Sequence, residues 1–141
     1  MPAHTTFRDA EIRNLLTGPT GPVVRTVETV ARRTGNLARV FVPVDKGTLR
    51  GSIREIIVIR GQLVVGRVFT PLEYGRYQHD GTGVYAGRGP IEAPPGKVLV
   101  FVPKGGGPTI YTKRVKGTPP TKFLLRALRI ASPWPVRDHS G

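Results

Sequence analysis

The residues best suited to chemistry in this sequence are His79 and Asp80, which stand side by side. An imidazole beside a carboxylate could serve in acid–base chemistry or bind a metal ion, but a metal site normally needs three or four converging ligands. The other two histidines, His4 and His139, lie close to the ends of the chain. We therefore expect a turn or interface role for this pair, and neither a metal site nor a cofactor site.

Hydroxyl groups and glycine-rich segments offer no stronger candidate. Ser52 and Ser132 have no base nearby in sequence and no Gly-x-Ser-x-Gly context. The Gly81-Thr-Gly83 segment is too short for a dinucleotide-binding loop, and Gly96-Lys97 lacks the Ser or Thr of a phosphate-binding loop. The absence of cysteine excludes disulfides, thiolate catalysis and cysteine-ligated zinc. We expect no catalytic residues and a protein that is not an enzyme.

Positive charge is the strongest compositional signal. The chain has 22 Lys and Arg against 9 Asp and Glu, a formal net charge of +13. This excess predicts attraction to an anionic partner such as nucleic acid, an acidic protein surface or lipid head groups. The candidate contacts with DNA or an acidic partner are Arg25, Arg32, Arg33 and Arg39.

The aromatic residues suggest a second set of contacts. Tyrosines could stack on bases, but no interleaved aromatic and basic motif is visible, which favours packing in the core or between subunits. The candidate contacts with other subunits or partners are Tyr74, Tyr77, His79 and Trp134.

The longest predicted element is an amphipathic helix from Pro22 to about Val40. Proline suits the first helical position, where its missing N–H costs nothing, and Pro43 ends the helix. Glu28 lies four residues before Arg32 in the favourable orientation, and Gly35 could kink or shorten the helix. The predicted apolar stripe consists of Val23, Val27, Val30, Thr34, Leu37 and Phe41.

The remaining elements are shorter. A helix over 6–16 precedes a Gly/Pro break, and Asp45 and Gly47 predict a turn before a hairpin with strands 52–59 and 63–69. Residues 84–96 read as a loop, 97–102 as a strand and 109–116 as a further strand. The last helix covers 122–131, with Phe123, Leu124, Ala127, Leu128 and Ala131 pointing inward.

These elements predict an α+β fold, in which a long amphipathic helix packs on a small antiparallel sheet, with a C-terminal helix and long Gly/Pro-rich loops. With 141 residues, 18 glycines and 14 prolines, the chain fits one modest core. We expect an N-terminal arm over 1–21 with room for a short helix, one domain over 22–131 and an extended tail over 132–141. No segment predicts a signal peptide or a membrane span.

Three blocks resemble the neck or tail-completion proteins of siphophages, which join the DNA-filled head to the tail. Residues 43–53 are similar to that family's Pro-Val-Asp-x-Gly-x-Leu-Arg-x-Ser-Ile junction between helix and strands. Residues 74–82 resemble its Tyr-x-x-Tyr-x-Glu-x-Gly-Thr element, with His79 where Glu is common. Residues 120–128 resemble its closing Pro-Phe-Leu-x-x-Ala-Leu helix, with two extra residues between Pro and Phe.

The resemblance implies a structural virion protein that assembles in the host cytoplasm into a homo-oligomeric ring, six-fold or twelve-fold, at the neck. Its partners would be head-closure or adaptor and tail-terminator proteins, with nonspecific contact to packaged DNA and none to membranes. Loop 84–96 and the tail around Trp134 would be ordered by neighbouring subunits. The main alternative is a nonspecific nucleic-acid-binding basic protein, which predicts a steep salt dependence of binding even for the isolated chain.

Overall fold

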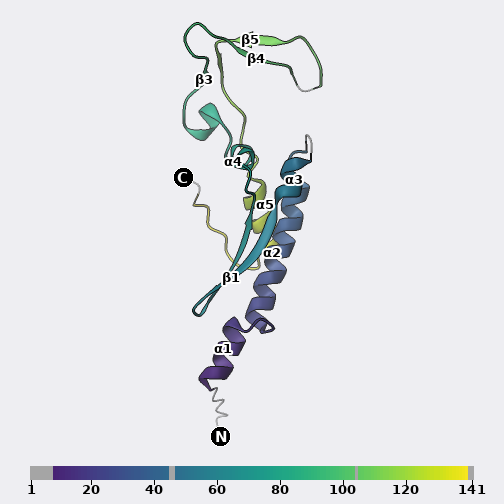
Figure 1. Ribbon diagram of the computed structural model, residues 1–141, viewed down its shortest axis with the longest axis vertical. Helices are drawn as coiled ribbons and strands as arrows, with labels where there is room; N and C mark the ends of the chain where they lie inside the picture. Colours follow the sequence, from purple (N-terminus) through teal and green to yellow (C-terminus); the bar gives the residue numbers. More distant parts are fainter. Residues whose placement is uncertain (1–7, 45–46, 104, 140–141) are drawn as a thin grey trace. The chain divides into compact units, whose positions relative to one another are not determined.

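The computed structural model describes residues 8–44, 47–103 and 105–139, and Figure 1 shows its elements. The chain forms two compact units. Unit 1 is the chain up to Pro71 together with Phe123–His139, and unit 2 is Leu72–Lys122. The segment predicted as one domain therefore contains the whole of a second compact unit, inserted between the two parts of the first.

Unit 1 is built around α2, Pro22–Phe41, with Pro22 in its first turn and Val42 as its C-cap. The prolines at both ends set these bounds as predicted. The helix runs through Gly35 without a break. Helix α1, Asp9–Thr17, precedes α2 and has no buried residue.

A β-hairpin packs against α2. Strands β1, Arg54–Arg60, and β2, Leu63–Phe69, pair antiparallel from Arg54 opposite Phe69 to Arg60 opposite Leu63. The first strand starts two residues later than predicted because Thr48–Ser52 forms a short helix, α3. Gly47 has φ of +75°, which fits the predicted turn, whereas Asp45 lies outside the described residues.

The core of unit 1 is rich in small side chains, and α2 contacts both the hairpin and α5, Phe123–Ala131. The most buried positions of α2 are Val24, Ala31, Thr34, Gly35 and Ala38. The predicted apolar stripe of α2 is therefore mostly half-buried. Thr34 is the one stripe residue in the buried class.

Helix α5 begins one residue later than predicted, after Lys122, whose φ is +50°. It places Phe123 and Ala127 in the core with no exposed surface, and burying a phenylalanine contributes about 2–3 kcal/mol. Leu128 was predicted to point inward, but it is exposed, so that prediction is wrong.

Unit 2 holds shorter elements. Helix α4, Glu73–Asp80, covers the tyrosine-rich segment, and a 3-10 turn, η1, Gly83–Ala86, follows it. The predicted loop 84–96 contains β3, Ile91–Glu92, which pairs with β6, Arg114–Val115. The predicted strand 97–102 is observed as the shorter β4, Leu99–Phe101. The predicted strand 109–116 divides into β5, Ile110–Thr112, and β6, and β5 pairs with β4.

Candidate functional site

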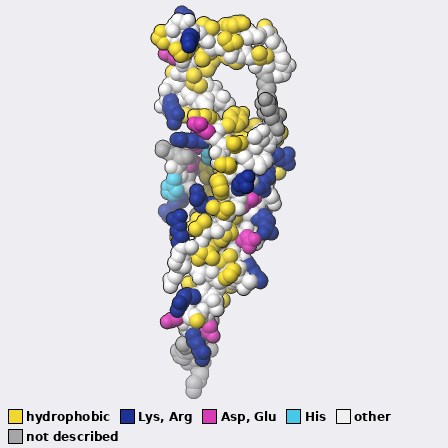
Figure 2. Space-filling view, in the orientation of Figure 1, with side chains coloured by type: hydrophobic (Ala, Val, Ile, Leu, Met, Phe, Trp, Pro, Cys, Tyr) yellow, Lys and Arg dark blue, Asp and Glu magenta, His cyan; other side chains and the backbone are white. Residues whose placement is uncertain are grey.

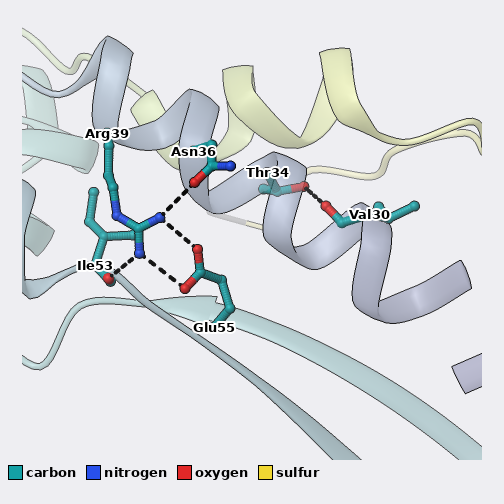
Figure 3. Close-up of polar contacts among 6 residues, drawn as sticks. All are labelled: Val30, Thr34, Asn36, Arg39, Ile53 and Glu55. Carbon is teal, nitrogen blue, oxygen red and sulfur yellow. Dashed lines mark hydrogen bonds and ion pairs between the residues drawn. The ribbon is translucent and has the colours of Figure 1, made fainter. Parts of the chain in front are cut away.

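Arg39, a sequence candidate for DNA or acidic-partner contact, is held inside unit 1. Its guanidinium donates to both Glu55 carboxylate oxygens, at 2.7 and 3.0 Å, to the Ile53 carbonyl oxygen at 2.7 Å and to Asn36 Oδ1 at 3.0 Å (Figure 3). The side chains of Arg39 and Glu55 are 29% and 24% exposed. This bidentate ion pair links α2 to the start of β1. Because the Arg39 guanidinium is already paired with a carboxylate, it is not available to an external anion.

The other three candidate arginines lie on the exposed surface of α2. Arg25, Arg32 and Arg33 are all exposed. Arg32 Nη2 lies 2.7 Å from Glu28 Oε1, which confirms the predicted pair, but the two side chains are 70% and 48% exposed. Such a surface pair is worth under about 1 kcal/mol, so Arg32 can exchange Glu28 for another carboxylate.

The candidate residues of the tyrosine-rich block share helix α4 and are linked by contacts within it. The Tyr77 hydroxyl donates to Glu73 Oε1 at 2.9 Å, and this hydrogen bond to a carboxylate raises the pKa of Tyr77. Gln78 Nε2 donates to the Tyr74 hydroxyl at 2.6 Å. Both tyrosines remain exposed, so their rings are accessible to a partner.

His79 and Asp80 form a local structural pair. His79 Nδ1 lies 2.8 Å from Asp80 Oδ1, and Lys122 Nζ lies 3.5 Å from the same oxygen. The hydrogen bond from His79, with help from the nearby Lys122 charge, lowers the pKa of Asp80. The backbone N–H groups of Thr121 and Lys122 donate to the carbonyls of Gln78 and His79, both at 3.0 Å. The pair thus lies where segment 118–122 is hydrogen-bonded to the end of α4.

The hydroxyl groups of Ser52 and Ser132, which were considered as nucleophiles, form hydrogen bonds with backbone groups. Ser52 Oγ donates to the Leu49 carbonyl at 2.7 Å and lies 2.6 Å from Thr70 Oγ1. Ser132 Oγ accepts the Trp134 N–H at 3.1 Å and lies at the same distance from the Trp134 carbonyl oxygen. Trp134, the candidate contact of the tail, is 53% exposed and belongs to unit 1.

Unit 2 carries a feature that the sequence did not reveal. Its buried residues, among those described, are Gly75, Gly81 and Gly83, whereas every fully buried apolar side chain belongs to unit 1. Backbone hydrogen bonds hold unit 2 together instead, such as Thr82 N to Thr118 O at 3.0 Å and Val84 N to Lys116 O at 2.8 Å.

Apolar side chains are exposed on both faces of the β4–β5 hairpin, which we call the apolar ribbon. Val100 pairs with Tyr111 on one face, and Phe101 pairs with Ile110 on the other. These four side chains are 56%, 68%, 41% and 38% exposed, and Figure 2 shows hydrophobic atoms along the ribbon. The sequence signal was the apolar run between Gly96 and Pro103, which predicted a strand but gave no indication of its exposure.

Within the described ranges, no group of three or more His, Cys, Asp or Glu residues is placed to hold a metal ion. No described helix is both long enough and apolar enough to span a membrane. Comparison with known proteins found no matching family model, no matching curated protein and no matching solved structure.

Proposed function

We propose that this chain is a structural virion protein of a tailed phage, part of the neck ring that joins the DNA-filled head to the tail. The three blocks that resemble siphophage neck or tail-completion proteins occur in the family's order. The first connects the end of α2 to α3 and β1, the second forms most of α4, and the third leads into α5. The α+β arrangement of unit 1 is the one that the resemblance implies.

The observation that carries the assembly proposal is the apolar ribbon. A two-stranded hairpin is marginally stable by itself in water, and it leaves two strand edges unpaired. A contiguous exposed apolar surface usually marks an interaction site. In a ring, each subunit can place its ribbon against the next copy, which covers both apolar faces without requiring a core in unit 2.

The test is the mass of the purified assemblies, measured alone and with siphophage head-closure and tail-terminator proteins. We expect rings of six or twelve 15.3-kDa subunits that bind those partners. The double variant Val100→Glu, Val102→Glu should abolish ring formation, because it places charge on the apolar ribbon at Val100 and on Val102, the 64% exposed residue that follows β4. Leu63→Glu, at a 60% exposed position in the other hairpin, is the matched control.

A protein that stays monomeric with these partners would contradict the neck proposal. Nonspecific nucleic-acid binding is the second candidate, and the net charge of +13 favours it. A monomer that binds duplex DNA or RNA with a steep salt dependence would support this second candidate.

A further inference from the structure

A second surface, in unit 1, lies between α2 and α5. It is an open groove of about 440 Å³, which we call the α2–α5 groove. It is lined by Thr29, Arg32, Arg33, Asn36, Leu37, Val40 and Ile130. None of these residues belongs to the apolar ribbon, so the groove is a separate candidate for binding.

The groove follows the axis of α2. Thr29, Arg33, Leu37 and Val40 are spaced by four, four and three residues, which places them in one row along the helix. At 1.5 Å per residue, this row is about 16 Å long. An occupant that lies along it must therefore present side chains over about three helical turns.

Three of the residues that line the groove are aliphatic. Val40 is 69% exposed and Ile130 is 54% exposed, with the half-buried Leu37 beside them. A single exposed aliphatic side chain is ordinary on a protein surface, but three that meet in one groove favour contact with apolar side chains. A sugar–phosphate backbone would leave these aliphatic side chains uncovered, so the groove suits a polypeptide better than nucleic acid.

The charged residues that line the groove are both positive. Arg32 and Arg33 are exposed, and no acidic residue is among those that line the groove. Glu28, which pairs with Arg32, is the nearby competitor for that charge. A complementary occupant therefore carries carboxylates that face the two arginines.

A second copy of this chain is a poor source of such carboxylates. Four of the nine Asp and Glu residues, Glu28, Glu55, Asp80 and Glu92, each have a cation of their own chain within 4.0 Å. The two acidic residues of α1, Asp9 and Glu11, share that short helix with Arg13. Each copy also has a net charge of +13. A different, acidic protein matches the groove better.

We propose that the α2–α5 groove binds an acidic amphipathic helix of a partner protein. Apolar residues of that helix, at spacings of three and four, pack on Val40, Leu37 and Ile130, and its flanking carboxylates pair with Arg32 and Arg33. The inference depends on the groove and its charge alone, so it stands whether or not the chain is a neck protein.

The test uses the full-length protein and a fluorescent helical peptide of about 14 residues, with leucines in one stripe and glutamates beside it. We expect saturable binding that is tighter than about 1 mM and is weakened by salt. One control peptide replaces every Glu with Lys, and another scatters the leucines around the helix. Both should bind at least about tenfold more weakly.

Variants of the groove complete the test. Val40→Asp and Arg33→Glu should each weaken peptide binding about tenfold or more. Val44→Asp and Arg60→Glu are the matched controls at exposed positions outside the groove, and they should leave binding unchanged. Glu28→Gln releases Arg32 and should tighten binding about two- to threefold, a gain that a damaged fold cannot produce.

Three outcomes would overturn the proposal. The first is no saturable binding of the acidic peptide up to about 1 mM. The second is equal binding of the peptide with scattered leucines, because charge alone would then suffice. The third is a short DNA duplex that displaces the peptide and responds to Arg33→Glu but not to Val40→Asp, which would identify a phosphate site. The mass of the assemblies is an independent measurement, so failure here leaves the neck proposal to its own test.

Discussion

Gly35 is the residue on which the fit between α2 and the hairpin depends most directly. A Cβ atom at this position would overlap the carboxylate of Glu55. That carboxylate cannot move without cost, because Arg39 holds both of its oxygens (Figure 3). Gly35, whose low helix propensity predicts a kink or an early end, is therefore where β1 approaches α2 closely.

We predict that Gly35→Ala destabilises the protein by about 1–2 kcal/mol, although alanine gains about 1 kcal/mol in helix propensity over glycine. The loss arises because the new methyl group displaces Glu55 and breaks its bonds to Arg39. In a Glu55→Ala background the obstacle is absent, so the same change should stabilise by about 0.5–1 kcal/mol. Urea unfolding of the four proteins completes this double-mutant cycle.

Gly51→Ala is the control for this cycle, because Gly51 lies in a helix and a Cβ there meets nothing within 4 Å. It should be neutral or stabilising in both backgrounds. The packing explanation would be wrong if Gly35→Ala had the same sign with and without the Glu55 side chain.

At the scale of elements, the sequence predicted best where local signals were strong. Pro22 and Pro43 bracket α2, and Gly61 with Gln62 connects two β-branched strands. These features act through neighbours in sequence, so they can be interpreted without the tertiary structure. The α+β class follows from them and is confirmed by the packing of α2 on the hairpin and α5.

Elements that depend on distant contacts were missed. Helix α4 contains Gly75 and has no apolar period, and the β3 strand exists because Ile91 pairs with Val115, far along the chain. Likewise, an apolar run such as 97–102 usually indicates a buried strand. Val100 is nevertheless exposed, because the described part of unit 2 does not cover it.

The stability of the contact between segment 118–122 and α4 should depend on pH, because Asp80 takes part in it. Its pKa is below the ordinary value because His79 donates to the carboxylate and Lys122 lies nearby. A lowered folded pKa gives stability that is complete above the unfolded value near 3.8 and is lost as the pH falls through the folded value. We therefore predict that amide protection at Thr121 and Lys122 falls below about pH 4.

Native-state hydrogen exchange, corrected for the intrinsic pH dependence of exchange, measures this effect. Asp80→Asn should lower protection at neutral pH and remove the loss below about pH 4. Glu92→Gln is the control, because Glu92 is 65% exposed and lies 4.0 Å from Arg114. If Asp80→Asn left the acid loss of protection intact, another group would be responsible.

At the scale of the whole molecule, the described residues carry positive charge in both units. Exposed basic side chains occur on α2 and α5 in unit 1 and on segments 76–116 in unit 2. Arg39, the one candidate arginine that is not exposed, is paired with Glu55. Among the candidate arginines, three exposed ones on α2 can therefore meet one DNA duplex from a single chain, whereas a ring would repeat these three in every subunit.

We predict that the isolated chain binds duplex DNA weakly, with a slope of log K against log salt of about −2 to −3, which corresponds to two or three phosphates. The assembled ring should bind with a much steeper slope, because several subunits contact the same duplex at once. Fluorescence anisotropy of one labelled duplex across a salt series, with the ring and with the monomeric Val100→Glu, Val102→Glu variant, measures both slopes. Equal and steep slopes would place the phosphate contacts within each subunit, and they would favour the nucleic-acid-binding function over the neck ring.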